Sequence, residues 1–247
     1  MGDDATGAAG EFSNIVGEHD LLTGDAIGPD YAHDEALVGE PVTPRYVARP
    51  QTAEQVAELL AAASAAGIPV TARGSGTGLS GAARPHADGL LISFEKMAST
   101  LEIDTGNQVA VVQSGVTLAD LDTVTAEHGL VYQVFPGELS ASLGGNVATN
   151  AGGMRAVKYG VTRHNVLGVQ AALGTGELIR AGGKITKISS GYDLTQLIIG
   201  SEGTLGLVTE VTLKLYPRLA HSATLLVPFA DLEAITHAVP AVLRTGV

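Results

Sequence analysis

The chain has 247 residues, of which 45% are hydrophobic, and a formal net charge of -12. This negative charge argues against a nucleic-acid partner, and the absence of cysteine excludes disulfides, iron–sulfur clusters and thiolate zinc sites. No apolar stretch reaches the ~18 to 20 residues of a transmembrane helix, and the acidic N-terminus lacks a secretory pattern, so we expect a cytoplasmic location.

The first part of the chain is expected to hold a leader and one small βαβ-containing unit. Residues 1–42 are interpreted as the leader, with a short helix around Glu11–Leu22. In the unit at residues 43–98, Thr52 with Gln55 three residues later predicts the start of a helix that ends near Gly67. The strands predicted here begin at Tyr46 and cover Pro69–Arg73 and Leu90–Ser93.

The second unit, residues 99–217, alternates apolar and polar positions between turn signals. A β-hairpin is predicted from Leu101, and Thr117 with Asp120 predicts a helix up to Gly129. The pattern therefore indicates an α+β fold with two subdomains that meet at glycine loops. The later predicted elements are a hairpin of Val166–Leu173 with Glu177–Arg180, a helix at Tyr192–Ile199, a long strand at Thr204–Tyr216, and, within residues 218–247, a strand at Ala223–Phe229 and a helix at Asp231–Arg244.

The sequence RGSGTGLSG at Arg73–Gly81, called here the first loop, follows a predicted strand. It matches the spacing of a dinucleotide fingerprint, but Pro85 and Gly89 follow where a Rossmann fold needs a helix, and no P-loop lysine follows either. Consecutive exposed amides in such a loop can bind a pyrophosphate through backbone N–H groups. A simple surface turn is the alternative.

Two more segments are rich in glycine and small residues. The second segment, Phe135–Gly153, would let a flat ligand lie against the backbone, although a helix packed tightly on a sheet would look similar. The third segment, Gly200–Glu210, is a glycine turn that leads into a strand, and an ordinary turn at a sheet edge is the alternative.

Taken together, these motifs resemble the FAD-binding domain of the vanillyl-alcohol-oxidase and para-cresol-methylhydroxylase (PCMH) superfamily. Within it, they are most similar to glycolate oxidase flavoprotein subunits, D-lactate dehydrogenases and D-2-hydroxyglutarate dehydrogenases. The resemblance covers roughly residues 44–217 and rests on PVTARGSGTGLSGAA, SLGGNVATNAGG, GYDL and GSEGTLGLVTE, which are specific only in combination. It implies a two-subdomain PCMH-type fold, with residues 43–98 and 99–217 as the FAD-binding subdomains.

The resemblance also implies which residues contact FAD. The first loop would hold the pyrophosphate, the second segment would lie along the ribityl chain and isoalloxazine, and the third would contact the adenosine end. Some relatives attach FAD through a histidine in the first loop, and this loop has none, so a non-covalent flavin is expected. The implied contacts are Arg73, Gly74, Ser75, Gly76, Thr77, Gly78 and Leu79, then Pro136, Gly137, Ser142, Gly145, Asn146, Thr149, Asn150 and Gly152, and finally Glu202, Gly203, Gly206 and Val208.

By the same resemblance, the activity is oxidation of a small-molecule 2-hydroxy acid, with electrons passed to another subunit or to a quinone. Family members carry a further cap domain for the substrate, of which residues 218–247 would be only the first β-α unit. We therefore expect a shortened form, one piece of a split enzyme or a remnant, inactive on its own. Alternatives are a non-catalytic flavin-binding subunit and the related reductase of enolpyruvyl-UDP-N-acetylglucosamine.

The histidines and carboxylates of the sequence indicate no further chemistry. The seven histidines show no HxxH or HxH spacing, so no metal site is predicted. Asp193 and Glu202 lie within the motifs, but neither is assigned as an acid or base. The catalytic residues are therefore left unknown.

Overall fold

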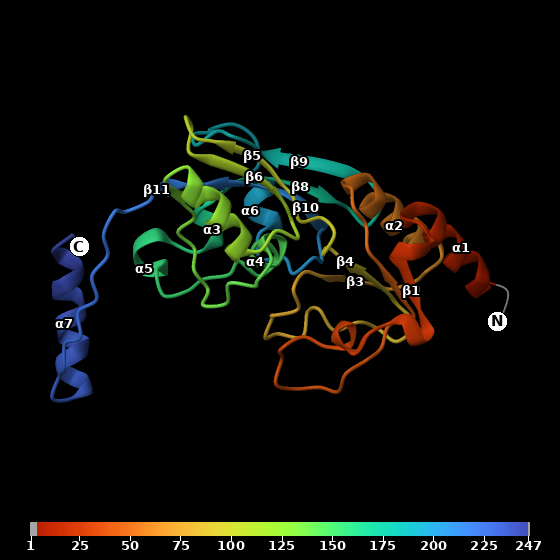
Figure 1. The fold of residues 1–247 in the computed structure, drawn as a ribbon, viewed down its shortest axis with the longest axis horizontal. Helices are drawn as coiled ribbons and strands as arrows, with labels where there is room; N and C mark the ends of the chain where they lie inside the picture. The colour runs from red at the N-terminus through yellow and green to blue at the C-terminus, as the bar shows by residue number, and fades with distance from the viewer. Residues whose placement is uncertain (1–3, 247) are drawn as a thin grey trace.

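The computed structural model describes residues 4–246 and contains two larger β-sheets, with helices packed against them, and a small two-stranded sheet (Figure 1). The N-terminal helix and the C-terminal helix lie at opposite ends of the molecule. No helix in the described range is long and apolar enough to cross a membrane. The mixed α+β architecture agrees with the fold class predicted from the sequence.

The first sheet has four strands in the order β1-β2-β4-β3. Strand β4 pairs in parallel with both β2 and β3, whereas β1 pairs with β2 in antiparallel fashion. Because β3 is an edge strand that ends at Arg73, the first loop leaves the sheet there. The strands are β1 (Leu21–Thr23), β2 (Tyr46–Ala48), β3 (Val70–Arg73) and β4 (Leu90–Ser93).

Helices α1 (Asp4–Val16) and α2 (Ala53–Ala65) pack on this sheet and on each other. Thr52 caps α2 by accepting a hydrogen bond from the Gln55 N–H, as predicted. Val56 and Phe12 are both fully buried in the shared core. A short 3-10 turn, η1 (Glu18–Asp20), joins α1 to β1, and two further turns, η2 (Gly24–Ala26) and η3 (Pro29–Ala32), follow β1.

The N-terminal region differs from the helix predicted at Glu11–Leu22. The helix begins at Asp4 and ends at Val16, and Leu21 already belongs to β1. Packing of Phe12 against Tyr46, with ring centroids 5.4 Å apart, explains why a segment with low intrinsic helix propensity is ordered. Residues 4–42, interpreted from the sequence as a leader, thus contribute a strand to the first sheet and a helix to its core.

The second sheet has five antiparallel strands in the order β5-β6-β10-β8-β9. Both hairpins predicted from the sequence, β5-β6 and β8-β9, are confirmed. The long strand β10 lies at the centre and pairs with one strand of each hairpin. The strands are β5 (Thr100–Asp104), β6 (Val109–Gln113), β8 (Val166–Ala172), β9 (Leu178–Gly182) and β10 (Leu207–Lys214).

The helices around this sheet fill the larger of the two cores. Thr117 and Asp120 form a capping box at the start of α3, which confirms the predicted helix start. Leu121, Leu143 and Leu213, from α3, α4 and β10, are buried together in that core. The remaining elements are α3 (Leu118–Glu127), β7 (Leu130–Val131), α4 (Leu143–Thr149), α5 (Ala156–Tyr159), η4 (Thr162–His164), α6 (Leu194–Ile198) and β11 (Tyr216–Pro217), which pairs with β7.

The C-terminal segment projects from the rest of the molecule (Figure 1). The strand predicted at Ala223–Phe229 is wrong, since these residues carry no strand and are exposed. Its apolar run has no neighbouring strand to pair with among residues 4–246, and an unpaired strand leaves its backbone groups without partners. The predicted helix is present as α7 (Leu232–Arg244), capped by Asp231, and none of its residues is buried.

Candidate cofactor site

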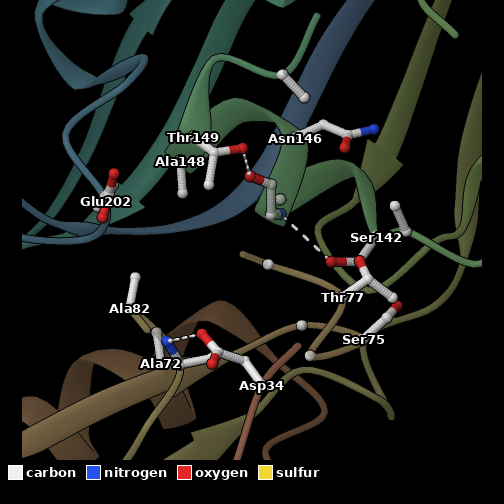
Figure 2. A pocket seen from close by; sticks show the side chains of 18 of the residues that line it. Asp34, Ala72, Ser75, Thr77, Ala82, Ser142, Asn146, Ala148, Thr149 and Glu202 are labelled. Atoms are coloured by element: carbon white, nitrogen blue, oxygen red, sulfur yellow. Dashed lines mark hydrogen bonds between the residues drawn. The ribbon is translucent and has the colours of Figure 1, made fainter. Parts of the chain in front are cut away.

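A cavity of about 750 Å³ lies where the first loop, the second segment and the third segment meet. Its volume falls within the ~300 to 1,000 Å³ of typical small-molecule and cofactor sites. Figure 2 shows side chains from all three segments around it, including Thr77, Ser142 and Glu202. Segments far apart in the sequence therefore form one site.

The first loop approaches its neighbours closely through glycines. A Cβ atom at Gly74 would lie 2.0 Å from the Ser142 Oγ atom, so only glycine allows the loop to pass the start of α4. Gly76 has a φ of +74°, and a Cβ atom there would lie 2.2 Å from a guanidinium nitrogen of Arg73. The loop thus presents its backbone to the cavity while Arg73 packs beneath it.

The second segment contains the short helix α4, so the prediction of a packed helix and that of a ligand wall both apply to it. Ser142 caps α4 by accepting a hydrogen bond from the Gly145 N–H, and Thr149 donates to the Gly145 carbonyl at 3.0 Å. A Cβ atom at Gly144 would lie 2.4 Å from the Ser114 Cβ atom. Glycine therefore lets α4 pack closely on the end of β6 while its other residues line the cavity.

The third segment is joined to the second by backbone hydrogen bonds. The Glu202 N–H donates to the Ala148 carbonyl, and the Gly200 N–H donates to the Val147 carbonyl, both at 2.9 Å. Glu202 has a φ of +51°, in the left-handed region that non-glycine residues rarely adopt. The bond to Ala148 helps to hold this conformation and places Glu202 in the wall of the cavity.

Three buried polar atoms in the cavity wall test whether an FAD-like ligand fits. The Ser114 Oγ, Asn146 Nδ2 and Ser201 Oγ atoms have no hydrogen-bond partner within the described part of the chain. Leaving such an atom unsatisfied costs roughly 1–3 kcal/mol, so hydrogen-bonding capacity remains in the wall after the protein's own bonds are made. With apolar Leu207 and Val208 in the same wall, these residues fit a flavin nucleotide, which has both polar and apolar parts.

The charges around the cavity decide how an anionic group would be held. Its wall includes the carboxylates of Asp34, Glu35, Glu138 and Glu202 but, among residues 4–246, no lysine or arginine. The backbone N–H and the hydroxyl of Ser140 both donate to Glu138, and they lower its pKa. A pyrophosphate would thus be held by backbone N–H groups and hydroxyls rather than by cations.

Nearly all the residues predicted as FAD contacts line this cavity, with Arg73 and Asn150 as the exceptions. Arg73 lines an adjoining cavity of about 640 Å³ and donates a hydrogen bond to the His33 carbonyl. Burial lowers its pKa, and the nearby carboxylates of Asp30 and Asp34 oppose that shift. Asn150 is the left-handed C-cap of α4, and its Oδ1 atom accepts a hydrogen bond from the Arg163 N–H at 3.0 Å.

Some lining residues were missed from the sequence. Ser114 follows a predicted strand and precedes Gly115, a signal that could have marked it. Ser201 and Gly144 lie within the singled-out segments but were not chosen. Asp34 and Glu35 lie in the region interpreted as a leader, where no motif points to them. The described residues contain no group of histidines or carboxylates suited to a metal ion.

Comparisons with known proteins identify an FAD-binding domain in this chain. The family described as an FAD binding domain matches residues 44–182. An uncharacterized FAD-linked oxidoreductase of Mycobacterium tuberculosis is 68% identical over 235 residues, covering 95% of this chain and 51% of the relative. A D-lactate dehydrogenase of Anaerostipes hadrus is 44% identical, covering 89% and 46%. The glycolate oxidase subunit GlcD of Bacillus subtilis is 40% identical, covering 83% and 45%.

The fold is also similar to that of solved structures. The structure of p-cresol methylhydroxylase with substrate bound matches 90% of this chain and 45% of its own chain, with a TM-score of 0.79 and 20% sequence identity. This likeness confirms the predicted PCMH-type fold. The chain spans about half the length of the curated relatives it matches. On the match over residues 44–182, this chain belongs to the FAD binding domain family.

Proposed function

We propose that this chain is the FAD-binding portion of an FAD-linked dehydrogenase that oxidises a 2-hydroxy acid to the 2-oxo acid. The observation that carries the proposal is the cavity in which three glycine-rich segments converge on buried, unpartnered polar atoms. The names of the relatives, D-lactate dehydrogenase and glycolate oxidase subunit, support the substrate class.

The roles of the residues follow from their positions around the cavity. The backbone N–H groups of Ser75 to Gly78 would hold the pyrophosphate, because glycine leaves them accessible. Asn146 and Ser114 would donate hydrogen bonds to the flavin part, and the third segment around Gly206 would contact the adenosine end. When bound, FAD supplies a hydride acceptor for the carbon that bears the hydroxyl group. The chain's apolar lining would keep water from that part of the site.

The proposal also covers the substrate, the attachment of the flavin, the electron acceptor and the cellular location. The substrate is a small 2-hydroxy acid of the D-lactate, glycolate or D-2-hydroxyglutarate type, and the flavin is held non-covalently. Electrons would pass to another subunit or to a quinone, and the protein would be located in the cytoplasm. No residue in the described range is assigned as the base that removes the hydroxyl proton.

The decisive experiment is an anaerobic reduction of a protein that contains this chain. The protein is first loaded with FAD, and D-lactate, glycolate and D-2-hydroxyglutarate are then added to separate samples. The flavin absorbance near 450 nm, roughly its usual maximum, is followed. Bleaching by one of these acids, but not by its 2-oxo product, is expected. A flavin that binds stoichiometrically and stays oxidised with all three acids would refute the proposed substrate class while leaving FAD binding intact.

A further inference from the structure

Residues 33–40, called here the clasp, run along the outside of the first loop. The Glu35 N–H donates to the Gly78 carbonyl at 2.9 Å, which ties the clasp to the middle of the loop. The Ala83 N–H donates to the Asp34 Oδ2 atom at 3.4 Å, just beyond the loop's last residue. Figure 2 shows the Asp34 side chain pointing toward this part of the chain. The clasp therefore contacts the loop through both its backbone and a side chain.

Two arginines fix the clasp at either side of the same loop. Arg73, at the start of the first loop, donates to the His33 carbonyl at the start of the clasp. Arg84, three residues after the loop, donates to the Glu40 carbonyl at 2.6 Å and to the Val38 carbonyl at 3.4 Å. Each guanidinium group reaches from the loop side to clasp carbonyls, so both ends of the clasp are held.

Two of the charged groups in these contacts, Asp34 and Arg73, are buried, so their contacts are not incidental surface pairs. Asp34 is only 6% exposed and Arg73 only 9%. Burying a charge is unfavourable unless several hydrogen bonds satisfy it. Asp34 meets this condition, because its Oδ1 atom also accepts from the Ala36 N–H at 3.2 Å. A carboxylate beside an anion-binding loop would repel the ligand, so its position is explained by holding the backbone rather than by touching FAD.

We propose that the clasp holds the first loop in the conformation that receives the FAD pyrophosphate, with Asp34 and Arg73 as its positioning residues. The inference rests on the assignment of the first loop to the pyrophosphate. The clasp lies wholly within the region interpreted from the sequence as a leader. That region is then part of the cofactor site's support.

The test uses Asp34→Ala and Asp34→Asn, with Asp88→Ala as a matched control. Asp88 is an exposed carboxylate in the connection between β3 and β4, which also contains the first loop. Isothermal titration gives the FAD affinity, melting without FAD gives the stability of the apo fold, and hydrogen exchange reports the protection of amides 75–83. Asp34→Ala should weaken FAD binding at least about tenfold, equivalent to roughly 1.4 kcal/mol. The FAD affinity of Asp34→Asn should lie between those of the wild type and Asp34→Ala, because the amide oxygen can still accept one backbone hydrogen bond.

The outcomes separate the clasp from the FAD assignment and from general destabilisation. Faster exchange confined to amides 75–83 in Asp34→Ala, with strands β8 and β10 still protected and with Asp88→Ala unchanged, supports the proposal. Wild-type FAD affinity in both Asp34 variants overturns it, and so does exchange that rises equally across β8 and β10. Failure of the wild-type chain to bind FAD would instead refute the cofactor assignment. If Asp34→Ala does not fold, Asp34→Asn provides the same comparisons.

Discussion

The replacement Gly76→Ala should weaken FAD binding far more than Gly78→Ala, although the two positions lie in one loop. Gly76 has a φ of +74°, and the new Cβ atom would lie 2.2 Å from the Arg73 guanidinium. At Gly78 the nearest atom to a new Cβ is the Asp34 Oδ2 at 3.9 Å, which is an ordinary contact. Both variants thus add one methyl group, but only position 78 has room for it.

The magnitude for Gly76→Ala has two parts. A left-handed conformation costs a non-glycine residue roughly 1–2 kcal/mol. Displacing Arg73 breaks its hydrogen bond to the His33 carbonyl, and a bond to a charged group contributes about 1.5–3 kcal/mol. If the loop relieves both by leaving its binding conformation, the two parts together lower the affinity roughly 10²- to 5 × 10³-fold.

Isothermal titration of FAD into the wild-type chain and the two variants measures this difference. A side chain at Gly76 that pointed into the cavity would fill the space of the phosphates. The structure directs the Cβ atom toward Arg73 instead, so the loop is disturbed from behind. Equal losses of affinity in Gly76→Ala and Gly78→Ala would refute this reasoning, as would wild-type affinity in Gly76→Ala.

Four further predictions follow from the site and its surroundings. Asn150→Leu should lower the melting temperature while the folded protein keeps its FAD affinity, because the Asn150 side chain binds the Arg163 backbone. Reduced flavin occupancy without a lower melting temperature would instead support the direct contact between Asn150 and FAD that the family resemblance implies. Ser114→Ala should leave the apo protein at least as stable in melting experiments, yet weaken FAD binding by ~0.5–1.5 kcal/mol in titrations, since it removes an unpartnered buried hydroxyl. Burial would raise the pKa of Asp20, but hydrogen bonds from Lys96 and Gln51 outweigh it and lower the pKa. Unfolding free energy from this group is therefore present above pH ~4 and lost on further acidification, so denaturant titrations should show a shallower acid slope in Asp20→Asn. Raising NaCl from about 0.02 to 0.5 M should speed FAD association, measured by stopped-flow fluorescence, because salt screens the repulsion between FAD and the acidic cavity wall. Slower association at high salt would contradict a cavity wall without cations.

The glycine-rich segments could be predicted from sequence because their signals are local. Close approach of backbone to a ligand demands glycine at particular positions, and three such runs in a fixed order are specific. The local sequence does not decide in favour of a helix at α4, because LGGNVAT has two glycines and two β-branched residues, which are poor helix formers. The Ser142 cap is a local signal, but the packing of α4 against β10 is not, and local patterns do not report it.

The errors have a common physical origin in partners that are distant in sequence. The apolar run at Ala223–Phe229 predicts a strand, but a strand needs a neighbour, and none within residues 4–246 pairs with it. The helix at the N-terminus starts seven residues before the predicted Glu11, because its stability comes from Phe12 in the α2 core. Asp34 was missed for the same reason, since its role depends on backbone atoms almost fifty residues away.

The acidic wall of the cavity explains why glycine spacing, rather than charge, marked this site. A phosphate site built from lysine or arginine can be recognised in a sequence by its basic residues. Here, in contrast, the cavity wall contains the acidic residues Asp34, Glu35, Glu138 and Glu202. Only oriented backbone N–H groups and hydroxyls can then offset the charge of a pyrophosphate, and their orientation depends on the loop's conformation. Affinity should therefore respond more to substitutions that move the backbone, at Gly76 or in the clasp, than to substitutions of individual wall side chains.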